Sequence, residues 1–352
     1  MNSFYFQKID DFYLLNNVQD KMWLLLVAEH CDFDYEELKS KKLACYGGIF
    51  PEIIYGEKHY NTGLIALELD FKPIFLNDID NAVLDAELIN KYDSLLVYVD
   101  GLSIHIDSFL VKLFEVTKEE TKILGGGAGK LTLKQEPVIF TPSNIMKDSA
   151  LIIPLKQKLS IGVNHGWEFL EGPFVATKSK KNTLYQINYK NAFDVYKKIV
   201  EEDSKMKINS DNFYKIAKSY PLGIVTYEKD MIVRAPITVK NNNLVLVGEI
   251  PTNSVINILK GNKHQLIFAA LEASKEATCK CNEDENSFAI VVDCISRSLY
   301  LEEFFEKEIK QIIGQVPNPS KLIGTLSLGE IANESDSFIT FYNNTCVVGI
   351  LC

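Results

Sequence analysis

Two charged residues in the last third of the chain could together bind a small charged molecule. Arg297 follows the apolar stretch FAIVVD, and Glu330 stands beside Gly329 at the end of the next apolar stretch. Ligands of open α/β sheets gather at the carboxyl ends of strands, which predicts that both side chains reach one crevice. A guanidinium group binds a carboxylate and a carboxylate accepts from an ammonium group, so the pair suits the two charged ends of an amino acid. The alternative is an internal ion pair between Arg297 and Glu330.

Three more candidates lie in the same part of the chain. Asn343 and Thr345 alternate within a strand-like run, so their side chains are expected to share one face. If that face is buried, both need hydrogen-bond partners, which are either a ligand or the turn that carries Glu330. Cys294 ends an apolar strand and is expected to be either a small buried residue or a nucleophile.

The first half of the chain adds three candidates. Asp100 ends an apolar stretch before Gly101, and it either contacts a ligand or caps the helix that follows. His165 and Trp167 flank a glycine and could line a pocket. His165 is also the first histidine to consider as an axial ligand of haem, the alternative being a hydrogen-bonded structural residue.

The stretch GGGAGK at 125–130 has the glycines and the lysine of a phosphate-binding loop but not their spacing. Such a loop needs a glycine five residues before its Gly-Lys pair and a Ser or Thr after the lysine, where this chain has Leu124 and Leu131. The glycines are therefore interpreted as a turn at a strand end, where another segment or a ligand can approach closely. Gly126 and Gly127 join the candidate ligand-binding residues on this ground.

No motif typical of a hydrolase or a transferase is found in the sequence. It lacks a GxSxG elbow, a paired-metal motif and a Cys-His constellation of distinctive spacing. We therefore expect no enzyme, no catalytic residue, no metal and no cofactor. An enzyme built from dispersed residues such as Cys294, Arg297 and Glu330 stays open as an alternative, because function belongs to sites and not to folds.

One order of elements occurs three times, in residues 22–50, 94–130 and 287–330. Each unit has an apolar strand, a helix-like run, a second apolar strand and then glycines, and it leads into another strand-like stretch. Continuous apolar runs of this length are typical of strands buried on both faces. The pattern predicts an α/β fold of two parts, with mixed sheets built from repeated β-α-β-Gly-turn-β units.

The segment between the second and third units is richer in strands. Residues 191–203 and 264–277 are nevertheless predicted to be helices, and the polar stretch SKMKINSDNFYK divides the chain near residues 203–210. Two domains are expected, over residues 1–205 and 206–352.

The composition of the chain limits which partners and which cellular compartment are expected. The chain has 352 residues and a formal net charge of −10, which disfavours nucleic acid and an anionic membrane surface as partners. No signal peptide and no membrane-spanning run is visible. The seven cysteines are an odd number in a long chain, so reduced thiols in a cytoplasmic protein are expected. Cys279 and Cys281 suggest a metal only weakly, because neither a second pair nor a nearby histidine completes four ligands.

Several short motifs, in their order and spacing, resemble the FIST family, a two-part sensory module of signal-transduction proteins. The resemblance covers nearly the whole chain and rests on these stretches: VYVDGLS at 97–103, LGGGAG at 124–129, HGW at 165–167, PFVAT at 173–177, NTLYQINYKNAFDVY at 182–196, YPLGI at 220–224, VRAP at 233–236, VDCISR at 292–297, LSLGEIAN at 326–333 and YNNT at 342–345. A Gly-Cys-Ser-type turn, frequent in the family after the second strand, is replaced here by GGIFPEII.

The resemblance implies a cytoplasmic sensor of a small, amino-acid-like metabolite. No output domain follows within the chain, so the signal is expected to pass to a separate partner protein such as a histidine kinase or a chemoreceptor. Some relatives are regarded as haem-containing nitric-oxide sensors, which makes a haem-binding gas sensor the alternative.

Overall fold

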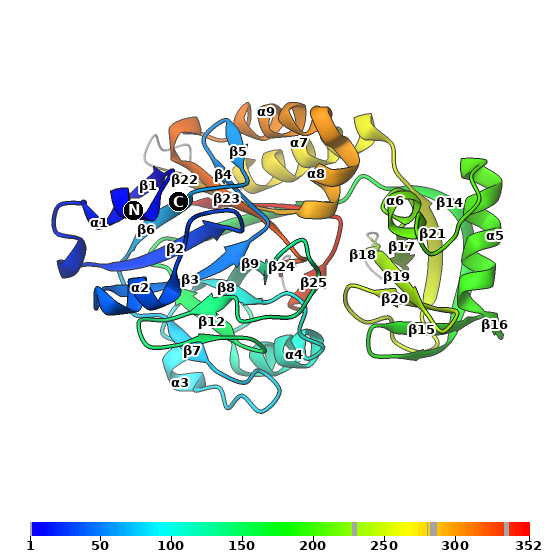
Figure 1. Ribbon diagram of the computed structural model, residues 1–352, viewed down its shortest axis with the longest axis horizontal. Coiled ribbons are helices and arrows are strands. Elements are labelled where there is room, and N and C mark those ends of the chain that lie inside the picture. The colour runs from blue at the N-terminus through cyan, green and yellow to red at the C-terminus, as the bar shows by residue number, and fades with distance from the viewer. Residues whose placement is uncertain (1, 227–230, 280, 282–286, 334–337) are drawn as a thin grey trace.

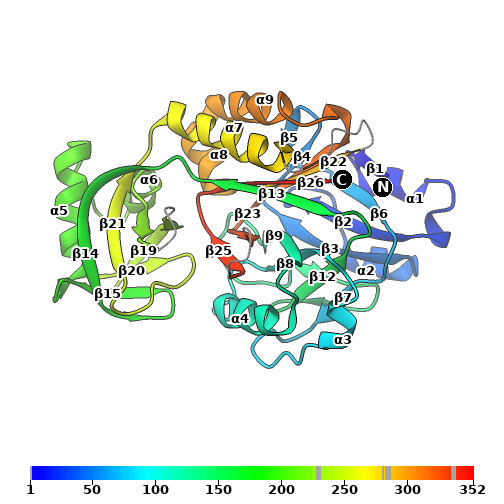
Figure 2. The same ribbon diagram turned by 180° about the vertical axis from the view of Figure 1, so that it is seen from behind.

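The computed structural model describes residues 2–226, 231–279, 281, 287–333 and 338–352, and within them the chain forms two lobes (Figure 1). The large lobe contains three six-stranded sheets in these residues, and the small lobe contains one eight-stranded sheet. Residues 168–260 form the small lobe, so the chain crosses between the lobes twice. The first crossing is residues 165–167 and the second is residues 261–262, and Figure 2 shows β13 running directly into β14 at the first.

Two of the three sheets of the large lobe contain strands from both halves of the sequence, and the first contains strands of the first half alone. The first consists of β1 (Ser3–Phe6), β6 (Leu64–Leu69), β2 (Met22–Ala28), β3 (Ala44–Phe50), β10 (Ile139–Phe140) and β11 (Ile145–Met146). The second consists of β25 (Thr340–Tyr342), β24 (Glu330–Ala332), β9 (Lys122–Ala128), β8 (Ser94–Asp100), β12 (Ala150–Pro154) and β7 (Ile74–Leu76). The third consists of β13 (Leu159–Asn164), β26 (Cys346–Leu351), β22 (Phe288–Cys294), β23 (Leu322–Ser327), β4 (Glu52–Tyr55) and β5 (Lys58–Tyr60).

Helices flank these sheets on two sides. They are α1 (Ile9–Tyr13), α2 (Tyr35–Ser40), α3 (Ala86–Ile89), α4 (Ile106–Val116), α7 (Lys263–Cys279), α8 (Ile295–Leu301) and α9 (Phe305–Ile313), with short 3₁₀ turns η1 (Val18–Asp20), η2 (Glu302–Phe304) and η3 (Pro319–Lys321). Figures 1 and 2 both show α7, α8 and α9 on one side of the large lobe and α3 and α4 on the opposite side.

The predicted α/β class with mixed sheets is confirmed. The strand pairs β2–β3, β8–β9 and β22–β23 are each parallel, and one or more helices lie between their two strands in the sequence. The remaining pairs of these sheets are antiparallel, such as β13 with β26 and β4 with β23. Because such pairs join distant parts of the chain, the large lobe is formed jointly by the beginning and the end of the sequence.

The small lobe consists of one sheet and two helices. Its strands are β18 (Ile232–Arg234), β17 (Leu222–Ile224), β21 (Val255–Lys260), β14 (Glu168–Lys180), β15 (Thr183–Ile187), β20 (Asn243–Leu246) and β19 (Pro236–Lys240), and β16 (Lys190–Asn191) pairs with β15. Its helices are α5 (Ala192–Ser204), which Asn191 caps, and α6 (Phe213–Ala217). The sequence boundary expected between residues 205 and 206 falls directly after α5, inside this lobe.

Most glycines of the repeated units lie within strands, so the prediction that they form turns is wrong for those at 47–48, 125–127 and 324. Gly329 does lie in a turn, between β23 and β24. Residues 47–48 are in β3 and residues 125–127 are in β9. A Cβ atom on Gly125 would lie 1.7 Å from the carbonyl oxygen of Val97, and one on Gly126 would lie 2.7 Å from Cγ1 of Val292. Glycine is required at these positions because neighbouring strands and sheets approach too closely for any side chain.

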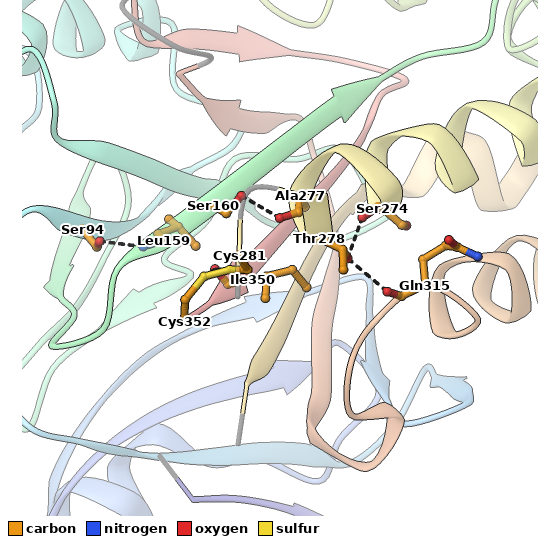
Figure 3. The surroundings of a disulfide bond; sticks show 10 residues. All are labelled: Ser94, Leu159, Ser160, Ser274, Ala277, Thr278, Cys281, Gln315, Ile350 and Cys352. Carbon is orange, nitrogen blue, oxygen red and sulfur yellow. Dashed lines mark hydrogen bonds between the residues drawn. A yellow bond between two sulfur atoms is a disulfide. The ribbon is translucent and has the colours of Figure 1, made fainter. Parts of the chain in front are cut away.

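Cys281 and Cys352 form a disulfide, so the prediction of reduced thiols is wrong for this pair (Figure 3). Cys281 follows the end of α7, and Cys352 follows β26. Beside them, the hydroxyl of Ser160 in β13 donates to the carbonyl of Ala277 at 2.6 Å. The C-terminal strand is thereby tied to α7. The cysteines described as free are Cys31, Cys45, Cys279, Cys294 and Cys346.

Candidate functional site

A cavity between the two lobes brings together several of the predicted site residues. Its large-lobe wall is formed by the start of α8, the turn between β23 and β24, and the segment after β25. These elements face α6, β19 and the end of β20 across the gap between the lobes in Figure 1. The polar residues in the lining are Cys294, Ser296, Asn343 and Tyr214, and the remainder are aliphatic side chains and Gly329. The cavity volume is about 40 Å³.

The turn at Gly329 forms one edge of the cavity. Gly329 has a φ of 102°, which side chains rarely adopt. The N–H of Gly127 donates to the carbonyl of Gly329, and the N–H of Leu328 donates to the carbonyl of Gly127, both at 2.8 Å. Gly126 is paired with Glu330 in the β9–β24 ladder. Gly126 and Gly127 thus contact this turn through their backbones, and neither is among the residues that line the cavity.

Glu330 and Thr345 lie behind this turn and bind each other. Oε1 of Glu330 accepts from the hydroxyl of Ser327, and Oε2 accepts from the N–H of Thr345, both at 3.1 Å. The hydroxyl of Thr345 donates to the carbonyl of Asn343 at 2.9 Å. Burial raises the pKa of Glu330 to about 8, because the charged form loses its hydration. Burial therefore favours the protonated form of this carboxyl.

Asn343 is buried, and only one of the two polar atoms of its side-chain amide has a hydrogen-bond partner among the described residues. Its Nδ2 donates to the carbonyl of Tyr342 at 2.7 Å, whereas its Oδ1 has no hydrogen-bond partner among the described residues. The residue is 1% exposed and lines the cavity. A buried acceptor without a donor costs free energy, and this oxygen is itself closed off from solvent.

Cys294 also lines the cavity, at the start of α8. Its Sγ lies 3.8 Å from Oδ1 of Asn344. Burial raises the pKa of the thiol well above its ordinary value, and the carboxyl of Glu330 acts in the same direction. The thiolate is the reactive form of cysteine, so this protonated thiol is a weak nucleophile.

Arg297, one turn further along α8, is enclosed by other groups of the protein. Its Nη2 donates to Oε2 of Glu308 at 2.7 Å, and its Nε lies 3.1 Å from Oδ1 of Asp293. The guanidinium is fully buried. Burial opposes its charge, but the carboxylates of Glu308 and Asp293 outweigh that cost and raise the pKa of Arg297. Among the ion pairs of the described residues, Arg297 pairs with these two and Glu330 does not take part.

Arg297 also holds both crossings between the lobes. Its Nη1 donates to the carbonyl of His165 at 2.6 Å, in the first crossing, and its Nη2 donates to the carbonyl of Leu266 at 2.9 Å, just after the second. Trp167 is fixed beside it, because its Nε1 donates to the carbonyl of Asn344 at 2.8 Å. These contacts connect the start of the small lobe to the third sheet and α7.

His165 is part of this crossing and does not line the cavity between the lobes. Its Nδ1 accepts from the N–H of Trp167 at 2.9 Å. Burial lowers the pKa of the imidazole to about 4, and the charge of Arg297 acts in the same direction. A haem held in the cavity would therefore not contact His165, the histidine predicted as its axial ligand.

Asp100 lies apart from these groups, at the end of β8. Its Oδ1 accepts from the N–H of Leu102 at 3.1 Å, and its Oδ2 accepts from Nε2 of Gln135 at 2.7 Å and from the N–H of Asp148 at 2.9 Å. Burial raises the pKa of this carboxyl, while the hydrogen bonds from Asp148 and Gln135 oppose the shift. Asp100 thus organises the loops that follow β8 and β11.

Two charged residues with structural roles in this region, Glu308 and Arg234, were not predicted from the sequence. Glu308 was not a candidate, although it lies at helical spacing between Phe305 and Ile312, on a face that is otherwise apolar. Arg234, in the VRAP stretch, was also missed; its Nη1 donates to the carbonyl of Phe341 at 2.7 Å and so joins the small lobe to β25. A charged residue inside an apolar pattern was the available signal in both cases.

Comparison with protein families assigns both parts of the chain. Residues 28–190 match the FIST N domain and residues 192–333 match the FIST C domain. The chain therefore belongs to the FIST family, whose domains are generally sensory domains in signal transduction.

One curated relative is the uncharacterized protein MJ1623 of Methanocaldococcus jannaschii, which is 23% identical over 230 residues. The match covers 59% of this chain and 44% of the relative, so the chain aligns with less than half of that protein. Within the described residues, no helix has both the length and the apolar character needed to cross a membrane.

Proposed function

We propose that the chain is a small-ligand sensor and that its ligand binds in the cavity between the lobes. The observation that carries this proposal is the composition of the cavity wall. Aliphatic side chains of both lobes surround four neutral polar residues, and one of these, Asn343, has an unused hydrogen-bond acceptor. Ligand sites in proteins are usually concave and mostly apolar, with a few polar groups that fix orientation.

The chemistry of the wall favours an uncharged metabolite over a zwitterionic amino acid. Recognition of an amino acid would need Arg297 and Glu330 to be free, but the guanidinium is bound to Glu308 and Asp293, and burial raises the pKa of Glu330 to about 8. Placing a charged group in a buried site without a partner is costly. An amino-acid-like ligand would thus have to bind through its uncharged part.

The position of the cavity suggests how binding becomes a signal. A ligand that contacts Ile237 of the small lobe and Leu328 of the large lobe favours the arrangement in which both walls are close. It shifts the conformational equilibrium only by the difference between its affinities for the two arrangements. A separate cytoplasmic protein, such as a histidine kinase or a chemoreceptor, would detect the relative position of the lobes.

Thermal unfolding in the presence of fractionated cell metabolites tests the proposal. A ligand at about 100 times its dissociation constant should stabilise the protein by about 2.7 kcal/mol. The Ile237→Trp variant fills the cavity from β19 and should lose this stabilisation. Thr238→Trp, on the exposed face of the same strand, is the matched control and should keep it.

Two results would count against the proposal. If a fraction stabilises both tryptophan variants as well as the parent protein, the ligand binds elsewhere. If no fraction stabilises the parent protein, the cavity is not a metabolite site.

A further inference from the structure

We propose that a groove beside the two crossings between the lobes is a second binding site, and that it takes a neutral molecule with several hydroxyl groups, such as a monosaccharide. The groove has a volume of about 560 Å³, within the range of about 300–1,000 Å³ that is usual for ligand pockets. None of the described residues that line it also lines the cavity at Gly329. The groove is thus a site beyond the proposed function, and neither depends on the other.

Both crossings and both lobes contribute to the walls of this groove. Glu168 begins β14 directly after the first crossing, and Gly261 and Asn262 form the second crossing. Tyr300 of α8 supplies the large-lobe side, whereas the end of α5, the segment after it and α6 supply the small-lobe side. A molecule bound here would therefore contact the small lobe, the large lobe and the second crossing together.

The aromatic part of the wall is fixed in position. The ring of Tyr300 packs against that of Trp167, with 5.4 Å between the ring centroids. Gly261 lies so close that a Cβ atom on it would be 2.4 Å from Cζ of Tyr300, and its N–H donates to the carbonyl of Ser219 at 2.9 Å. An aromatic ring offers an apolar face to the C–H groups of a sugar ring. Because the wall is preformed, little ordering has to accompany binding.

The charges of the wall balance one another. Two carboxylates and two ammonium groups line the groove, and they belong to Glu168, Asp203, Lys215 and Lys260. Glu168 and Lys260 are directly opposite each other in the β14–β21 ladder, and Nζ of Lys260 lies 3.5 Å from Oδ1 of Asp203. Because the formal charges cancel, no excess charge attracts an anion or a cation. An ionic ligand would instead have to compete with these internal contacts.

The groove also offers many hydrogen-bond donors and acceptors. Oδ2 of Asp203 accepts from the hydroxyl of Tyr220 at 2.8 Å, and Oε1 of Glu168 accepts from Nδ2 of Asn262 at 3.2 Å. A carboxylate has about four acceptor positions and an ammonium group three donors, so these contacts leave capacity on both. Burial and the charge of Glu168 raise the pKa of Tyr300, which keeps its hydroxyl protonated at neutral pH. Since a hydroxyl group both donates and accepts, a polyhydroxylated ligand can bond to carboxylates and ammonium groups of one wall without bringing a charge.

Binding of sugars that share a ring and differ in charge tests the proposal. Glucose is compared with glucuronate and glucosamine, and galactose with galacturonate and galactosamine, by NMR titration of the full chain. Each neutral sugar should bind more tightly than its charged analogues by about threefold or more, because an added charge loses hydration and meets a like charge on the wall. Its affinity should also stay unchanged when NaCl is raised from about 0.1 M to about 1 M, over which the Debye length falls from about 10 Å to about 3 Å.

A pair of tryptophan variants locates the site. Met206 lines the groove and is 47% exposed, so Met206→Trp narrows the groove without entering the core and should abolish sugar binding. Val255→Trp is the matched control, because Val255 is 40% exposed on β21 of the same lobe and does not line the groove. It should bind both neutral sugars as the parent protein does.

Three results would overturn the proposal: no binding of either neutral sugar, equal binding by the two tryptophan variants, or tighter binding of a charged analogue with an affinity that falls as salt rises. None of them bears on the cavity at Gly329, which the Ile237→Trp variant tests separately. If Met206→Trp does not fold, the indole N–H signal of Trp167 in the parent protein still locates the site, because this ring packs against Tyr300. That signal should shift on addition of the neutral sugars, and an unshifted signal places them elsewhere.

Discussion

Two buried polar regions adjoin α8: a charged one around Arg297 and a neutral one at the cavity wall. At Arg297 the guanidinium donates to Glu308, His165, Leu266 and Asn344, all within the protein. At the cavity, Asn343 has an amide oxygen without a described partner. Arginine is the more obvious ligand-binding residue by type, but its hydrogen-bonding capacity is used internally. An arginine is therefore not by itself evidence of a ligand site, because the charge of Arg297 is neutralised within the protein.

The region around Arg297 has a structural role that could pass a change in the cavity on to both connections between the lobes. Arg297 holds the carbonyl of His165 in the first crossing and that of Leu266 after the second, while Cys294 and Ser296 of the same segment line the cavity. A displacement of the start of α8 by a ligand would therefore act on both connections between the lobes. This shared element is a physical route by which occupancy of the cavity could alter the position of the small lobe.

Removal of the arginine should have the largest effect on stability. Arg297→Met leaves Glu308 and Asp293 buried without their cation, and breaking a buried pair in this way costs about 3–5 kcal/mol. Urea unfolding followed by circular dichroism measures this loss. Lys310→Met, at an exposed position of α9, is the control and should change stability by less than about 0.5 kcal/mol. A loss for Arg297→Met as small as that of the control would mean that the cluster is not a structural clamp.

The turn at the cavity edge should be sensitive to a single methyl group. A Cβ on Gly329 would lie 2.3 Å from Cζ of Phe341, and its φ of 102° is strained for alanine. Gly329→Ala should therefore lower stability by about 2 kcal/mol. Gly56→Ala is the matched control, because Gly56 also has a positive φ, 57°, but nothing lies within 4 Å of its Cβ position. Gly56→Ala should lower stability by only about 1 kcal/mol. Equal losses of stability in the two variants would show that the turn at Gly329 can relax around the added methyl group.

The fold was largely predictable from local patterns, whereas the site was not. Apolar runs such as residues 94–99 and 288–292 predicted buried strands, because a strand covered on both faces has a recognisable sequence. The roles of Arg297 and Asn343 depend on partners that come from distant segments, Glu308 on α9 and the small-lobe wall around Ile237. The strand glycines were misinterpreted for the same reason: the close approach that requires Gly126 comes from Val292, far away in the sequence.

The smallest predicted effect is the change of stability between pH 6 and pH 7, which again distinguishes the two regions. The folded-state pKa of Glu330 is about 8, above the ordinary value of a glutamate, because of burial, so the folded protein holds a proton that the unfolded chain releases. Stability should consequently fall as pH rises from about 4.5 to about 8, by at most about 1.4 kcal/mol per pH unit for this group. Glu330→Gln should flatten the curve of unfolding free energy against pH between 6 and 7. Glu302→Gln, at an exposed position, is the control. An unchanged slope in Glu330→Gln would mean that Glu330 is ionised in the folded protein. The region behind the Gly329 turn would then be charged and no longer comparable with the neutral cavity wall.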